Sequence, residues 1–197
     1  MSLTTFKPYI CPFVAGDRVI ELGGGPGDAS GMPIFRPNID ARNGPMVDIV
    51  HDLSKTPWPL LPNQFNGIYS SFWLEHVSHK LIRNVIAEIY RILAPGGLAV
   101  LITADTWAQC KKIVDAGPEG MSDGLVNMLF GGGDYEGNFH RCGFSRPRAV
   151  NLFKEAGFFD VRTLDHPGIF GPQGYEEVTT DFIIEAYKSN AKISYQL

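Results

Sequence analysis

The chain has 197 residues, of which 44% are hydrophobic and 19% are charged, and its formal net charge is -4. This length and composition predict a single globular domain over residues 1–197 that folds without disulfide or metal crosslinks. The mild acidity argues against a nucleic-acid-coating or membrane-surface protein, because both need broad fields of lysine and arginine.

The cysteines and the apolar runs bear on the cellular compartment of the protein. The three cysteines are widely spaced and form no CxxC pair, so neither a disulfide framework nor a thiolate zinc site is predicted. No apolar run approaches the roughly 18 residues of a membrane span, and the first residues have no signal-type apolar core. We therefore expect a cytoplasmic protein with no membrane partner.

The first half of the chain predicts four strands and a helix. A strand over residues 18–22 enters the glycine loop Gly23-Gly24-Gly25-Pro26-Gly27, where no strand can continue. Further strands are predicted over residues 38–40, 47–51 and 67–71. Ser78 can cap a helix whose apolar side chains recur at helical spacing and which ends before Pro95.

The second half alternates in the same way. Residues 98–103 are nearly all apolar, which is typical of a central parallel strand buried on both faces. Residues 105–145 form a looser insertion with helices predicted over 106–116 and 123–130. A helix over 146–156 and strands over 159–164 and 180–187 follow. This order predicts a mostly parallel sheet wrapped by helices on both faces, with ligands at the carboxyl ends of the strands.

The glycine loop fits neither of two common phosphate-binding motifs. The chain has no Gly-Lys pair for GxxxxGK[ST], and a GxGxxG motif started at Gly23 or Gly25 finds Asp28 or Ser30 at its third glycine. The loop instead follows Glu21 in an alternating pattern of glycines. A carboxylate at this place opposes a pyrophosphate and suits a ligand with positive charge.

Four segments resemble one family. Residues 19–27 (VIELGGGPG) resemble the first motif of class I S-adenosylmethionine-dependent methyltransferases, and residues 68–77 (IYSSFWLEHV) are similar to the type 11 group. Residues 88–97 and 152–158 extend the resemblance in the family's order. It implies an α/β, Rossmann-like class I methyltransferase fold, with a seven-strand, mostly parallel sheet flanked by helices.

The resemblance also implies S-adenosyl-L-methionine as the cofactor. Asp40 ends the second strand, where a carboxylate can accept both ribose hydroxyls, and Asp52 follows the third strand, where the family uses an acid for the adenine amine. No metal site is predicted. The implied cofactor-binding residues are Glu21, Gly23, Gly24, Gly25, Gly27, Asp40, Ala41, Asp52, Leu53, Ser70 and Ser71.

The chain departs from the family between the glycine loop and the second strand. Only twelve residues, 28–39, lie there, and they include Gly31, Pro33 and Pro37, so a long helix cannot fit. The aromatic side chains of the N-terminal segment, Phe6, Tyr9 and Phe13, are expected to replace its cover.

Methyl transfer from a sulfonium mainly needs alignment, and a hydroxyl acceptor also needs a base. Histidine suits that role near neutral pH. His140, inside the insertion, is favoured as the base or as a substrate ligand, and His76, after the fourth strand, is the alternative catalytic residue. The insertion over residues 105–145 is interpreted as a lid or substrate-binding segment.

The sequence thus predicts a methyltransferase that acts on a small-molecule or sugar-like acceptor, with oxygen as the expected acceptor atom. Nucleic acid is disfavoured, because the chain has neither an Asn-Pro-Pro-Tyr motif nor a Pro-Cys nucleophile. A non-catalytic cofactor-binding partner subunit and an aminopropyltransferase-like enzyme on the same fold remain alternatives. The identity of the acceptor and the oligomeric state stay open, a homodimer being one alternative.

Overall fold

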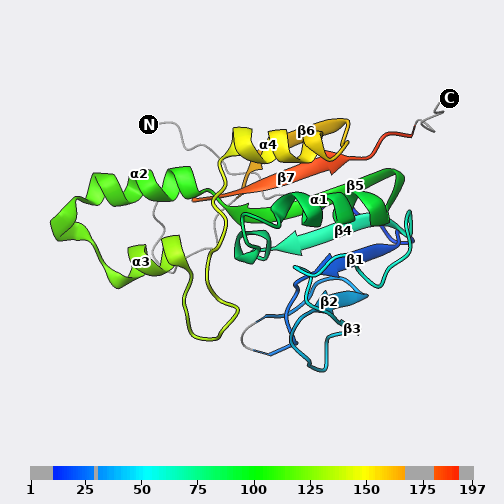
Figure 1. The fold of residues 1–197 in the computed structure, drawn as a ribbon, viewed down its shortest axis with the longest axis horizontal. Helices are drawn as coiled ribbons and strands as arrows, with labels where there is room; N and C mark the ends of the chain where they lie inside the picture. The colour runs from blue at the N-terminus through cyan, green and yellow to red at the C-terminus, as the bar shows by residue number, and fades with distance from the viewer. Residues whose placement is uncertain (1–10, 29–30, 167–179, 191–197) are drawn as a thin grey trace.

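The computed structural model describes residues 11–28, 31–166 and 180–190. Its centre is a seven-stranded sheet with the order β3-β2-β1-β4-β5-β7-β6 (Figure 1). The five strands from β3 to β5 in this order are parallel, and β7 is antiparallel to both β5 and β6. The predicted fold class is therefore confirmed. The strands are β1 (Val19–Leu22), β2 (Asn38–Asp40), β3 (Ile49–Val50), β4 (Phe65–Ser71), β5 (Leu93–Ala104), β6 (Asp160–Asp165) and β7 (Asp181–Tyr187).

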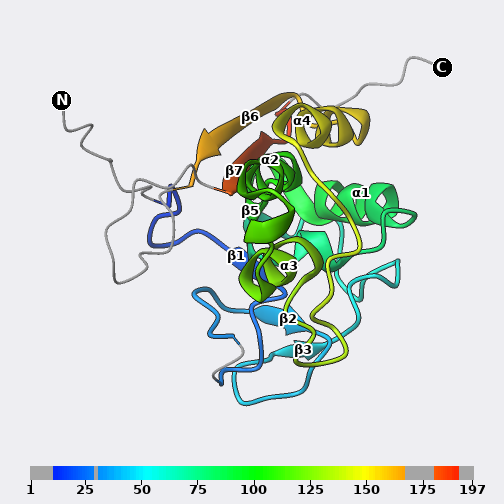
Figure 2. The same cartoon turned by 90° about the vertical axis from the view of Figure 1, so that its left-hand side faces the viewer.

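Two helices, α1 and α4, cover one face of the sheet, whereas α2 and α3 extend away from it beyond the strand ends (Figures 1 and 2). In β1, Ile20 and Leu22 point to the covered face and share a buried core with Ile86 of α1 and Phe153 of α4. The helical segments are η1 (Leu74–His76), α1 (Ile82–Ile92), α2 (Thr106–Ala116), η2 (Pro118–Gly120), α3 (Asp123–Phe130) and α4 (Arg146–Glu155).

Helix α1 begins later than the sequence indicates. The expectation that Ser78 caps it is wrong, because Leu81 occupies the N-cap position without a side-chain cap. The Ser78 carbonyl instead accepts a hydrogen bond from Leu81 N at 2.8 Å, which closes a turn before the helix. The backbone is thus already turning when it enters α1.

The opposite face of the sheet has a different cover from the one predicted. Its buried residues include Val19, Tyr69 and Val100, and Phe13 and Phe35 pack against them from segments outside the named helices and strands. The Phe13 and Phe35 rings are 5.6 Å apart between centroids, and Phe35 and Tyr69 are 5.2 Å apart. In this region aromatic side chains from loops cover the sheet, in agreement with the expectation for Phe13 but not with the general prediction of helices on both faces. Phe6 and Tyr9 lie outside the described residues.

The connection from β1 to β2 is short and lacks the long helix that the sequence also excludes. Residue 28 and residues 31–37 form no helix. Gly31 lies against Gly25, and a side chain at Gly25, whose φ is 88°, would overlap the Gly31 backbone. The glycine loop and its crossover therefore pack directly on each other.

Candidate functional site

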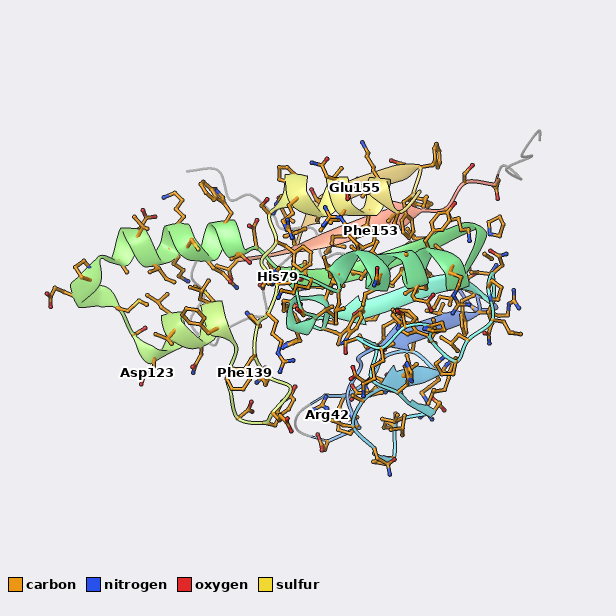
Figure 3. The ribbon with its side chains drawn as sticks, in the orientation of Figure 1. Arg42, His79, Asp123, Phe139, Phe153 and Glu155 are labelled. Atoms are coloured by element: carbon orange, nitrogen blue, oxygen red, sulfur yellow. The ribbon has the colours of Figure 1, made fainter. Side chains whose placement is uncertain are left out.

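The carboxyl ends of β1, β2 and β4 meet at one edge of the sheet, where the glycine loop, η1 and the loop after α3 converge. In Figure 3 the labelled Arg42, just after β2, lies next to the loop that follows α3. The Arg42 guanidinium lies 4.7 Å from the centroid of the Tyr135 ring in that loop. The insertion thus reaches back to the end of β2.

Hydrogen bonds hold the glycine loop onto β2. Gly23 N donates to the Ile39 carbonyl at 2.8 Å. Gly24 N donates to Asn38 Oδ1 at 3.1 Å, and Gly25 N donates to Asp40 Oδ2 at 2.9 Å. Gly27 N is engaged within the crossover, where the Gly31 carbonyl accepts it. The loop geometry is therefore determined by the chain itself, before any ligand binds.

Glu21 points into the crossover. Its Oε2 accepts the backbone N–H groups of Ile34 and Phe35 at 2.6 and 2.7 Å. The residue is 2% exposed, and this burial raises the pKa of the carboxyl group although the two N–H donors lower it. Glu21 thus anchors the short crossover, a role that the sequence pattern did not reveal.

Asp40 is buried at the end of β2, with most of its acceptor capacity in use. Oδ2 accepts from Gly25 N, and Oδ1 accepts from both Arg42 N at 2.8 Å and Arg42 Nε at 3.2 Å. A carboxylate offers about four acceptor positions, so one position remains for a further donor. Ala41 lies between Asp40 and Arg42 in the chain.

The other residues of the predicted cofactor set differ in exposure. Asp52 is partly exposed and its Oδ1 accepts from both Ser54 N and Ser54 Oγ, which leaves Oδ2 beside Lys55 at the surface. Leu53 is 2% exposed in the core. Ser70 is buried and its Oγ donates to the Leu22 carbonyl at 2.9 Å, while Ser71 ends β4 half-buried.

A cavity of about 570 Å³, a size suited to a small molecule, lies at the carboxyl ends of β4 and β5, and none of the predicted cofactor-binding residues lines it. It contains both predicted catalytic histidines. Its lining comes from the ends of β4 and β5, from η1, α2 and α3, from the loop after α3 and from the start of β7: Phe72, Glu75, His76, Ala104, Gln109, Met128, Asp134, Tyr135, Asn138, His140, Thr180 and Asp181.

The two alternative catalytic residues, His76 and His140, lie next to each other in the structure. Their ring centroids are 5.1 Å apart with an interplanar angle of 71°. Nδ1 of His76 lies 3.1 Å from the Phe139 carbonyl, and Nδ1 of His140 lies 3.2 Å from the Leu129 carbonyl. Burial lowers the pKa of both imidazoles, and the neighbouring His140 lowers that of His76 further. Burial thus favours the uncharged form of both rings.

Two acidic side chains of the cavity were missed by the sequence reasoning. Glu75 is 1% exposed, burial raises its pKa to about 7, and its Oε2 accepts from Thr103 Oγ1 at 3.0 Å. Burial, followed by the charge of Asp105, raises the pKa of Asp181 to about 6. The position of Glu75 directly before His76 was a usable signal. Asp181 begins the last strand in sequence, and only the antiparallel pairing of β7 brings it to this edge.

One family model matches most of the chain. A family model described as a methyltransferase domain matches residues 4–163. A search of curated proteins found no match. No helix in the described part of the chain has the length and apolar character of a membrane span.

Several solved structures share the fold. One is an S-adenosylmethionine-dependent methyltransferase from Thermotoga maritima, described as a possible histamine N-methyltransferase, with 19% identity, a TM-score of 0.56, and coverage of 89% of this chain and 84% of that chain. Another, from Mesorhizobium loti, has 18% identity, a TM-score of 0.56 and coverage of 89% and 93%. The 1,6-didemethyltoxoflavin-N1-methyltransferase of Burkholderia thailandensis, solved with its substrate and S-adenosylhomocysteine, has 13% identity, a TM-score of 0.51 and coverage of 87% and 70%.

Proposed function

Because the chain belongs to the family of methyltransferase domains, a class I S-adenosylmethionine-dependent fold, we propose that it methylates a small-molecule or sugar-like acceptor at an oxygen atom. The observation that carries this proposal is the cavity of about 570 Å³ at the carboxyl ends of β4 and β5, which contains the paired imidazoles of His76 and His140. The family match favours methyl transfer over the alternatives of a non-catalytic binding subunit and an aminopropyltransferase.

S-adenosylmethionine is the cofactor, and when bound it supplies a methyl group already activated on a sulfonium centre. The residues at the strand ends fit it chemically. Its ribose hydroxyls and adenine amine are donors, and Asp40 and Asp52 each have an acceptor position left. Residues 23–28 contain no lysine or arginine, so the loop has no positively charged side chain to bind a phosphate.

We assign the cofactor to the edge formed by the glycine loop, the Asp40-Ala41 and Asp52-Leu53 pairs and the end of β4 at Ser70 and Ser71. Glu21 and Ser70 act here mainly by holding the backbone, through the crossover N–H groups and the Leu22 carbonyl. Rigid backbone at this edge would align the methyl group with an acceptor in the cavity.

His140 is the proposed base. With its Nδ1 proton donated to the Leu129 carbonyl, Nε2 carries the lone pair that would accept the acceptor's hydroxyl proton. Burial lowers the pKa of His140, which favours the unprotonated ring. His76, in contact with it, is the proposed substrate ligand or second proton acceptor.

The test is a panel of small hydroxylated acceptors, scored by release of S-adenosylhomocysteine. With an acceptor in hand, His140→Ala should lower turnover by roughly 10²–10⁴-fold and leave S-adenosylhomocysteine affinity nearly unchanged, because the base acts on the acceptor. His79→Ala, which alters an exposed histidine outside the cavity, is the matched control. Loss of cofactor affinity in His140→Ala, or activity only towards amines, would contradict the proposal.

A further inference from the structure

Three ligand-type side chains converge in the cavity. Glu75, His76 and His140 each offer one carboxylate oxygen or imidazole nitrogen, and these atoms all lie within 4.8 Å of one another. Glu75 and His76 come from η1, whereas His140 comes from the loop after α3. Two imidazoles bound to one tetrahedral zinc ion have ring centroids roughly 5 Å apart, given a Zn–N distance of about 2 Å. The observed separation of 5.1 Å between the His76 and His140 rings matches that spacing.

The surroundings of both rings suit metal ligation. A histidine that binds a metal through one nitrogen usually donates its other N–H to a carbonyl or carboxylate, which fixes the ring and its tautomer. Here Nδ1 of His76 faces the Phe139 carbonyl and Nδ1 of His140 faces the Leu129 carbonyl. In that tautomer both Nε2 atoms carry a lone pair for a cation.

Gln109 supplies an independent observation. It lies on α2, is 3% exposed and lines the same cavity. Its Oε1 is buried and has no hydrogen-bond partner among the described residues. Leaving a buried carbonyl oxygen without a partner is unfavourable, so this oxygen indicates that a donor or a cation belongs in the cavity.

We propose that Glu75, His76 and His140 bind one divalent transition-metal cation of the Zn²⁺ type, with Gln109 Oε1 accepting a hydrogen bond from a molecule bound to it. Two imidazoles and one carboxylate favour Zn²⁺, Co²⁺ or Fe²⁺ over Mg²⁺, which prefers oxygen ligands. Three protein ligands leave a fourth position open to the cavity. The set also pairs the buried Glu75 carboxylate with positive charge.

A bound cation would replace the base role proposed above for His140, because an Nε2 lone pair that binds a cation cannot also accept a proton. An acceptor hydroxyl in the open position would lose its proton to solvent more readily, because a bound cation lowers the pKa of a coordinated oxygen. In the metal-loaded protein His140 would therefore act on the acceptor through the cation. Cation binding itself requires neither the cofactor nor an acceptor.

The test is calorimetric titration of tag-free, chelator-treated full-length protein with Zn²⁺ alone. We expect one ion per chain and a rise in Tm on binding. Glu75→Gln, His76→Gln and His140→Gln should each weaken the affinity at least about tenfold. His79→Gln, at an exposed histidine near the cluster in sequence, should bind as the wild type does. Gln109→Leu should weaken binding less than the three ligand variants.

Absence of one-to-one binding would overturn the proposal, and so would equal weakening in the His79 and His140 variants. If a variant fails to fold, the absorption spectrum of Co²⁺ in the wild-type protein decides. A strong tetrahedral-type spectrum supports the site, and a weak octahedral one, as for the hydrated ion, overturns it. S-adenosylhomocysteine titration of the metal-free protein separately tests the proposed function.

Discussion

Asp40 combines a structural and a binding role in one side chain. Its hydrogen bonds to Gly25 N and Arg42 hold the glycine loop in place, and only one acceptor position remains for a ligand. The sequence placed a carboxylate at the end of a strand but could not show that the chain itself engages it. The donors are Gly25 N and Arg42 N, which are 15 and 2 positions from Asp40 in the sequence, and only the folded structure shows that they bind it.

We expect Asp40→Asn to weaken S-adenosylhomocysteine binding by about 1.5–3 kcal/mol, because a single amide oxygen cannot serve Gly25 N, Arg42 and a ribose hydroxyl together. Asp52→Asn should cost less, since its amide oxygen can still accept from an amine. Calorimetry on both variants measures the difference, with Asp17→Asn at an exposed position as the control. A folded Asp40→Asn protein with wild-type affinity would remove Asp40 from the cofactor site.

The two cavity histidines are brought together by backbone hydrogen bonds of the neighbouring residue Glu75. The Glu75 carbonyl accepts hydrogen bonds from Arg141 N at 2.8 Å and Cys142 N at 3.0 Å. These bonds tie the loop after α3 to η1 and bring His140 against His76. The pairing of residues 64 positions apart thus depends on backbone contacts that carry no sequence signal.

At the level of elements, the crossover between β1 and β2 replaces a helix by direct backbone packing. Gly25 has a φ of 88°, and a Cβ there would lie 2.6 Å from the Gly31 Cα. Glu21 completes the arrangement by binding the N–H groups of Ile34 and Phe35. The glycines of this loop therefore serve close packing as well as the turn.

Gly25→Ala should destabilise the protein by about 2–5 kcal/mol, the sum of the positive-φ cost and the overpacking cost. Gly117→Ala is the matched control, because Gly117 has a φ of 69° but no heavy atom lies within 4 Å of the position that a Cβ would take there. It should lose only about 1–2 kcal/mol. Urea unfolding measures both, and equal losses would show that Gly31 yields without cost.

At the scale of the whole molecule, the ion pair of Glu88 and Arg91 on α1 binds the backbone of the segment before β4 and so holds that segment on the helix. Glu88, 8% exposed, accepts from Trp58 N at 2.7 Å and from Arg91 Nε and Nη2 at 2.7 Å each. Arg91 also donates to the Leu60 and Trp58 carbonyls. Burial raises the pKa of Glu88, but the hydrogen bonds from Arg91 and Trp58 lower it more, and the net pKa lies below its usual value.

This depressed pKa predicts how stability changes with pH. The contribution of Glu88 is present above its unfolded pKa of about 4.3 and is lost as the pH falls through its lower folded pKa. Glu88→Gln should therefore cost about 1–3 kcal/mol at pH 7, and the difference from wild type should shrink towards pH 3. Glu155→Gln, in an exposed pair with Arg83 (Glu155 is labelled in Figure 3), should change stability by less than about 1 kcal/mol. A pH-independent difference for Glu88→Gln would contradict this account.

The sequence by itself determined the fold class, the seven strands, the glycine loop and the acids at the strand ends. These features follow from local patterns: apolar runs, glycine spacing and the position of a charge relative to a strand. The same patterns marked His76 and His140 as candidates and indicated that residues 28–39 leave no room for a long helix.

Only the tertiary structure decided how these parts meet. The aromatic cover of the second sheet face, the Glu21 anchor, the arrival of Asp181 at the cavity edge and the Glu75–His76–His140 cluster all join segments distant in sequence. Such contacts depend on the strand order and on backbone hydrogen bonds between loops, which any residue type can make. Side-chain patterns along the chain therefore cannot specify them, and they form only when the sheet brings the loops to one edge.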